Sequence, residues 1–129
     1  MMANADGIVA KNAQRCVARP DEPELCTSVV VQCELAFGLV KRPSMRLQAA
    51  LDAQLAGLVV LPLDEQAVAH YAFLRAHLEA RGQPIGPNDA LIAAHALALG
   101  ATLVSGDAEF LRVPGLRVEN WLSDENIAK

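Results

Sequence analysis

Three acidic side chains lie in or next to apolar segments, where acidic residues are uncommon. Glu34 interrupts an otherwise apolar helical stretch, Asp89 opens the most apolar helical segment, and Asp107 directly follows a buried strand candidate. Each has an ordinary explanation taken alone: a wet helix face for Glu34, helix capping and the helix dipole for Asp89, and a turn for Asp107. Together they indicate a site for a hard cation such as Mg²⁺ or Mn²⁺, which prefers oxygen ligands.

A cation held by carboxylates can bind a phosphodiester oxygen, generate hydroxide and stabilise the leaving oxygen. Competing chemistry has less support, because the sequence contains no P-loop, no dinucleotide-binding glycine motif and no serine nucleophile elbow. The three cysteines, Cys16, Cys26 and Cys33, have no metal-binding spacing, and we expect them to be small buried apolar residues. His95 is expected to be a hydrogen-bonded core histidine.

Composition limits the class of protein. The chain has 129 residues, of which 53% are apolar and 20% charged, and its formal charge is −4 from 11 basic and 15 acidic residues. These values predict one compact domain, 1–129, and exclude both intrinsic disorder and a generic basic DNA-coating protein. Because the sequence has neither an apolar run long enough for a bilayer nor a signal-peptide pattern at Met1–Ala10, we expect a cytoplasmic protein without membrane contact.

Strand and helix patterns alternate along the chain, which predicts an α/β domain with a mainly parallel sheet. In such folds the chemistry lies beyond the carboxyl ends of the strands. Residues 8–19 could form a helix, and a loop should follow at 20–23. We expect 58–61 to be a strand buried on both faces, and helix 64–80 to face inward with Val68, Tyr71, Leu74 and Leu78. The remaining expected strands are 25–27, 101–104 and 116–119, and the remaining expected helices are 28–40, 45–55, 88–99 and a short one ending at Arg112.

Four sequence blocks occur in a familiar order. They are Ser28-Val29-Val30-Val31-Gln32-Cys33-Glu34-Leu35, Pro84-Ile85-Gly86-Pro87-Asn88-Asp89 followed by Ile92-Ala93-Ala94-His95-Ala96, Thr102-Leu103-Val104-Ser105-Gly106-Asp107-Ala108-Glu109-Phe110, and Val118-Glu119-Asn120-Trp121. With these blocks the sequence resembles PIN-domain ribonucleases of the VapC toxin type over about Leu25–Leu122.

The resemblance implies a single PIN-like α/β domain with a mainly parallel central sheet flanked by helices. It implies a toxin that cuts RNA with Mg²⁺ or Mn²⁺, forms a homodimer and is silenced by a cognate VapB-like antitoxin. By match to the family motifs, Glu34, Asp89 and Asp107 would be the catalytic and metal-binding acids, with Ser28 and Asn88 as polar support. An antitoxin would occupy an apolar groove and place a basic side chain near the carboxylates.

The N-terminal segment, 1–24, departs from the family. The family opens with a strand that ends in an Asp-Thr-Asn-like motif, whose Asp is the first metal ligand, and alignment on Asn4 puts Met2 at that position. Asp6 is a candidate substitute. Two functions therefore stand side by side: an endoribonuclease toxin, or a catalytically impaired module that dimerises and docks the antitoxin without cutting. A third, a phosphatase-like α/β hydrolase, would need a nucleophilic Asp loop motif that the sequence does not contain.

Overall fold

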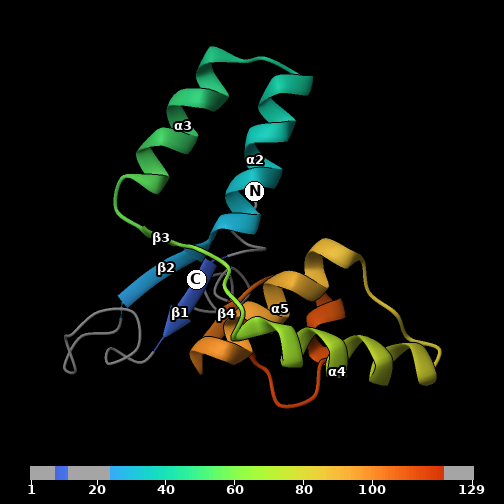
Figure 1. Ribbon diagram of the computed structural model, residues 1–129. Coiled ribbons are helices and arrows are strands. Elements are labelled where there is room, and N and C mark those ends of the chain that lie inside the picture. The colour runs from blue at the N-terminus through green and yellow to red at the C-terminus, as the bar shows by residue number, and fades with distance from the viewer. Residues whose placement is uncertain (1–7, 12–23, 121–129) are drawn as a thin grey trace, which may run out of the picture.

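The computed structural model describes residues 8–11 and 24–120. Within this part of the chain, one five-stranded sheet is accompanied by four α-helices and one 3-10 helix (Figure 1). Nearly every element lies within two residues of its expected bounds, so the α/β class is confirmed. The elements are β1 Ile8–Lys11, β2 Glu24–Ser28, α2 Val29–Lys41, α3 Met45–Leu55, β3 Val59–Leu61, α4 Ala67–Ala80, α5 Pro87–Leu99, β4 Thr102–Val104, η1 Ala108–Arg112 and β5 Arg117–Glu119.

The sheet is mixed: four of its five strands run in one direction, and the central strand is reversed. Its order is β3-β2-β1-β4-β5, and β2 pairs with β3, and β4 with β5, in parallel. β1 is antiparallel to both of its neighbours: Val9 pairs with Cys26 on one side and with Leu103 on the other. Four strands therefore point the same way, and their carboxyl ends share one edge of the sheet.

The helix expected over 8–19 is wrong at its beginning, where Ile8–Lys11 forms β1. Ile and Val favour strands, and the space between β2 and β4 offers backbone partners on both sides, which a local reading of the sequence does not include. The rest of that range, and the loop expected at 20–23, lie outside the described residues.

The interpretation of 58–61 as a strand buried on both faces is also wrong. β3 is one of the two outer strands of the sheet, and Val59 is 45% exposed. An outer strand has a neighbour on one side only, so an apolar run of strand length does not by itself establish burial.

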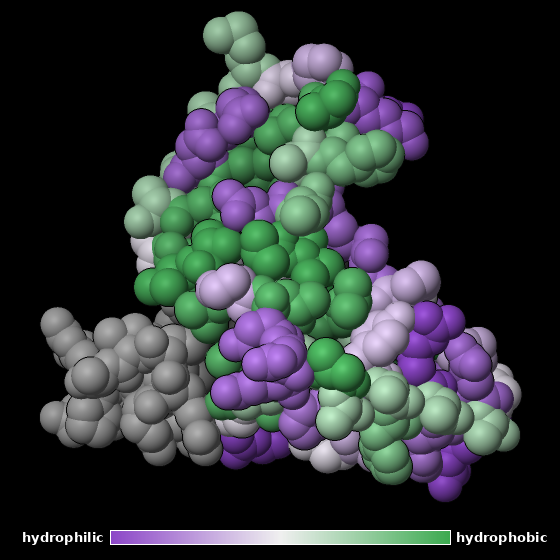
Figure 2. Space-filling model, in the orientation of Figure 1, coloured by the Kyte–Doolittle hydropathy of each residue, from purple (hydrophilic) through white to green (hydrophobic). Residues whose placement is uncertain are grey.

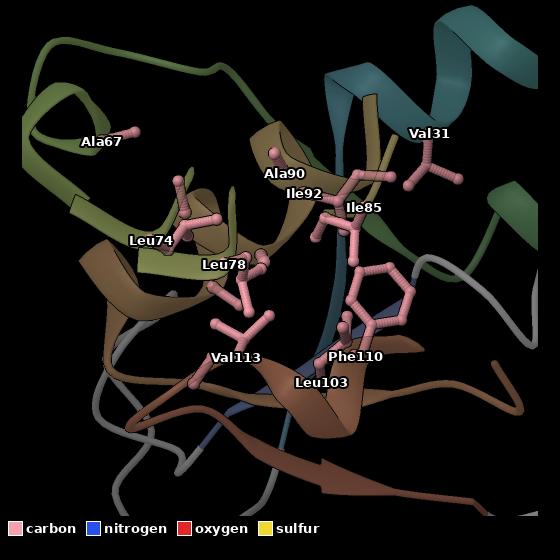
Figure 3. Packing of buried hydrophobic residues seen from close by; sticks show 14 of the residues in the cluster. Val31, Ala67, Leu74, Leu78, Ile85, Ala90, Ile92, Leu103, Phe110 and Val113 are labelled. Atoms are coloured by element: carbon pink, nitrogen blue, oxygen red, sulfur yellow. The ribbon is translucent and has the colours of Figure 1, made fainter. Parts of the chain in front are cut away.

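The core lies where α4 and α5 pack against each other and against the sheet. In Figure 3, Leu74 and Leu78 of α4 meet side chains from α5 and from the segment around Phe110. α5 is the most buried helix, as expected, and it ends at Gly100, whose φ of 65° is the left-handed conformation that glycine adopts readily.

The inward face of α4 differs from the expected one by a single residue. Leu74 and Leu78 are buried and Tyr71 is half-buried, but Val68 is 64% exposed and Ala67 is buried in its place. Ala67, Tyr71, Leu74 and Leu78 follow the helical spacing i, i+4, i+7, i+11, and therefore share one face.

Helices α2 and α3 form a hairpin that projects from the sheet (Figure 1). Both begin at a serine cap: Ser28 accepts a hydrogen bond from the Val30 N–H, and Ser44 accepts one from the Leu47 N–H, each at 3.1 Å. The hairpin carries much exposed apolar surface, visible in the upper part of Figure 2. Its exposed large apolar residues are Phe37, Val40, Met45 and Leu47.

The cysteines have different environments. Cys26 is buried in β2, as expected, whereas Cys33 is exposed on α2, and the expectation of burial is wrong there. Cys16 lies outside the described residues. Among the described helices, none is both long and apolar enough to cross a membrane.

We expect Phe110→Ala to lower the free energy of unfolding by about 3–5 kcal/mol, because it removes a fully buried ring and leaves a cavity in the core. Phe73→Ala is the matched control: the Phe73 ring is 63% exposed on α4, and its loss should change stability by less than about 1 kcal/mol. Urea unfolding measures both values, and equal losses would contradict this assignment of the core.

Candidate functional site

Asp89, the first of the candidate site residues, lies in the first turn of α5. Gly86 is the N-cap residue and Pro87 occupies the first turn, where its missing N–H removes no helical hydrogen bond. Asp89 is half-buried in the same turn. The exposed N–H groups and the dipole at a helix N-terminus stabilise a negative side chain there.

The loop and 3-10 helix after β4 present two further acids, and hydrogen bonds hold this segment in place. The backbone N–H of Asp107 donates to the buried Ser105 Oγ at 3.0 Å, and the Glu109 N–H donates to Asp107 Oδ1 at 2.9 Å. The Ser105 N–H donates to the Glu119 carbonyl of β5 at 2.9 Å. Asp107 thus caps the 3-10 helix η1, the turn role that its position suggests, while its carboxylate stays at the carboxyl end of β4.

Asp89, Asp107 and Glu109 form a carboxylate cluster. One oxygen from each lies within 4.8 Å of the others, and all three residues are half-buried. Ions of the Mg²⁺ and Ca²⁺ type bind oxygen at about 2.0–2.6 Å, so two ligands on opposite sides of one ion are about 4–5 Å apart. The separations and the all-oxygen donor set therefore fit a hard divalent cation.

Glu34 is not a member of this cluster. It lies on an exposed face of α2, and its Oε2 accepts a hydrogen bond from Asn88 Nδ2 at 3.0 Å. Asn88 is the residue before Asp89, so the contact links Glu34 to the turn that carries the cluster. Of the three acids predicted from the sequence, the structure brings Asp89 and Asp107 together and connects Glu34 to them through Asn88.

Glu109 was not among the residues predicted from the sequence. It stands two residues after Asp107, a spacing that in a strand would place the two side chains on one face but in a helix would separate them. The Asp107 cap begins η1 at this point, and the tight turn returns the Glu109 carboxylate to the cluster. The sequence feature that could have indicated Glu109 is a second acid two residues after Asp107, just beyond the end of a strand.

A buried hydrogen bond joins the beginning of α2 to the middle of α5. Ser28 Oγ lies 2.8 Å from His95 Nδ1, and the two residues are 1% and 3% exposed. The His95 ring also donates a hydrogen bond to the Pro62 carbonyl. Burial lowers the pKa of His95, partly opposed by the charge of Asp64 and by the Pro62 hydrogen bond. His95 is therefore the hydrogen-bonded core histidine expected from the sequence.

The neutral ring can satisfy both Ser28 and the Pro62 carbonyl. If one ring nitrogen donates to Pro62, Nδ1 accepts the hydroxyl hydrogen of Ser28, and Ser28 Oγ still accepts the Val30 N–H. The bond fixes α2 relative to α5, and with it the distance between Glu34 and Asn88.

A family model for the PIN domain matches residues 8–116. Among known proteins, the chain is similar to the tRNA(fMet)-specific endonuclease VapC of Salmonella typhimurium, with 38% identity over 100 residues that cover 75% of each chain. It is 39% identical to ribonuclease VapC2 of Rickettsia felis over 99 residues, which cover 75% of this chain and 74% of that protein.

Solved structures give the same relationship. VapBC2 of Rickettsia felis, bound to a DNA fragment from its promoter, superposes with a TM-score of 0.70 at 40% identity over 74% of both chains. VapBC-1 of Haemophilus influenzae has a TM-score of 0.70 at 32% identity, over 77% of this chain and 75% of that one.

The lowered pKa of His95 predicts a pH-dependent stability. In the unfolded chain the imidazole titrates near its usual pKa of about 6.5, so below that pH the unfolded state binds more protons than the folded state. The free energy of unfolding should therefore fall as the pH decreases from about 6.5 through the lower pKa of the folded protein. Urea unfolding at neutral and at mildly acidic pH measures the change.

His95→Gln is the matched variant, because an amide can bond to Ser28 but does not titrate. It should lose about 1–3 kcal/mol of stability at neutral pH through imperfect replacement of the buried hydrogen bonds, with a weaker decline on acidification. An equal decline in both proteins would contradict a role for His95 in the pH dependence.

Proposed function

Because the chain belongs to the PIN domain family, we propose that it is a metal-dependent endoribonuclease of the VapC type. It would hydrolyse RNA phosphodiester bonds as the toxin of a toxin–antitoxin pair, acting in the cytoplasm. The observation that carries this proposal is the carboxylate cluster Asp89–Asp107–Glu109 at the carboxyl edge of the sheet, in a chain similar to proteins named VapC ribonucleases.

Asp89, Asp107 and Glu109 would hold a Mg²⁺ or Mn²⁺ ion, and Glu34 would complete the acidic site beside them. When bound, the ion would offset the charge of the phosphodiester and make water more acidic. Glu34, oriented by the Asn88 amide, is suited to accept a proton from the attacking water. Ser28 and Asn88 act as supports, since one fixes the start of α2 and the other bonds directly to Glu34.

Glu109 bears on the departure of the N-terminal segment from the family motif. Met2 and Asp6 lie outside the described residues. Among the residues that the structure describes, the three acids of the cluster come from α5 and from the loop and 3-10 helix after β4. A donor set of three carboxylates is sufficient for Mg²⁺, which keeps several waters when it binds to proteins. We propose that Glu109 supplies the carboxylate that the family motif would place at the end of the first strand.

An antitoxin and a second copy of the chain are the proposed protein partners. Solved neighbours of this chain are VapBC complexes, and the α2–α3 hairpin exposes a large apolar surface of the kind that marks protein interfaces. The carboxylate cluster would attract a basic side chain of an antitoxin, which would occupy the place of the cation.

We expect the purified chain to cleave single-stranded RNA with Mg²⁺ or Mn²⁺ and to stop on addition of EDTA. Asp89→Asn should reduce the rate by about 100-fold or more, because loss of a direct ligand should exceed the 10–100-fold effect of residues around a metal site. The matched control is Glu65→Gln, an exposed acid before α4 that should leave the rate unchanged. A metal-independent rate, or an active Asp89→Asn protein, would overturn the proposal. Antitoxin binding without any RNA cleavage would instead identify the chain as a binding module.

Glu109 can be tested without activity. Glu109→Gln should weaken Mn²⁺ binding by about 10–100-fold, and Asp107→Asn should do the same, because its amide oxygen can still cap η1 while the charge is lost. Isothermal titration with Mn²⁺ measures the affinities, again with Glu65→Gln as control. An unchanged affinity in Glu109→Gln would remove this residue from the metal site.

A further inference from the structure

A pocket of about 550 Å³ lies beside the Glu34–Asn88 contact. Four of its lining residues come from α2 at positions i, i+3, i+4 and i+7, and Asn88 closes it from α5. The volume is within the range of small-molecule sites, and the pocket has an apolar side and a polar side. The lining residues are Val30, Cys33, Glu34, Phe37 and Asn88.

The apolar side carries an exposed aromatic ring. Phe37 is 65% exposed, although the chain has only five aromatic residues with which to fill its core. Lys41 follows one helical turn later, and its Nζ lies 5.7 Å from the centroid of the Phe37 ring. An aromatic ring with a cation over one face offers a nucleotide two interactions: stacking of the base on the other face, and charge pairing of the phosphate with the cation.

The polar side connects the pocket to the carboxylate cluster. Asn88 Nδ2 donates to Glu34 Oε2 at 3.0 Å, and Asn88 is the sequence neighbour of Asp89. The negative charge of Glu34 disfavours a phosphate inside the pocket, whereas Lys41 favours one at its outer end. The charges therefore suit an uncharged base inside and its phosphate outside.

We propose that this pocket seats one nucleobase of the single-stranded RNA substrate, stacked on Phe37, with Lys41 paired to a flanking phosphate. The inference rests on the proposed ribonuclease function and adds to it a determinant of which nucleotide lies beside the cleavage centre. A purely apolar side chain of a protein would gain from Phe37 but not from Lys41 or from the Glu34–Asn88 pair, so the observations favour RNA.

The test measures RNA binding without cleavage. Asp89→Asn protein in EDTA is titrated into a fluorescent single-stranded RNA of mixed sequence, and into the same RNA with one base removed at each position in turn. Phe37→Ala in this background should bind the intact RNA about tenfold more weakly, the size expected for one base–aromatic stack. Phe73→Ala, which removes an equally exposed ring from α4, should bind like its parent.

The decisive result is non-additivity. If Phe37 stacks on a base, one abasic RNA should bind as weakly as the intact RNA binds to Phe37→Ala, and Phe37→Ala should cause no further loss with that RNA. Additive losses at every position would overturn the proposal.

Lys41 gives an independent measurement. Lys41→Gln should reduce affinity at low salt and lower the slope of log affinity against log salt by about 0.7, the contribution of one single-strand phosphate. Arg81→Gln, an exposed cation at the end of α4, is the control and should leave the slope unchanged. An unchanged slope for Lys41→Gln would overturn the proposed phosphate contact.

The outcomes separate this inference from the function on which it rests. If the wild-type chain cuts no RNA and the Asp89→Asn protein binds none, the ribonuclease proposal fails as well. If the wild type cuts RNA while Phe37→Ala binds RNA normally, only the pocket inference fails. Normal RNA binding by Phe37→Ala together with loss of antitoxin binding would assign the pocket to a protein partner instead.

Discussion

Three carboxylates held within 4.8 Å of one another repel, and the fold must hold them together against that repulsion. Rigid backbone supplies the restraint. Asp89 is fixed in the first turn of the most buried helix. Asp107 and Glu109 are fixed by the capped start of η1, and the preceding loop is tied to β5 by the hydrogen bond from the Ser105 N–H to the Glu119 carbonyl. A divalent cation would relieve the repulsion, so the same geometry favours binding of the ion.

The second constraint is the buried bond between Ser28 and His95. It connects the end of β2 and the start of α2 to α5, two segments that are 67 residues apart in the chain. Through this bond, the helix that carries Glu34 keeps a fixed relation to the helix that carries Asn88. The apolar interior raises the cost of breaking it, because either partner would then lose a hydrogen bond away from water. Precision at the exposed Glu34–Asn88 contact thus depends on a buried contact.

The centre of the sheet is the least conventional part of the molecule. β1 runs against its neighbours, yet the four other strands remain parallel and present their carboxyl ends at one edge. The acids of the cluster belong to α5 and to the loop and 3-10 helix after β4, and none of them depends on the direction of β1. The proposed role of Glu109 therefore does not rest on the direction of β1.

Much of the molecule could be predicted from local patterns. Serine caps marked the starts of α2 and α3, and glycine marked the end of α5. A helix start for Asp89 and a strand end for Asp107 indicated a shared site. The sequence could not reveal the reversal of β1, the exposure of β3 and Val68, or the separation of Glu34 from the cluster that Glu109 joins. Capping and periodicity act between residues a few positions apart, so the sequence displays them directly. Strand direction, burial and the meeting of side chains depend on partners far along the chain, and only tertiary packing selects among them.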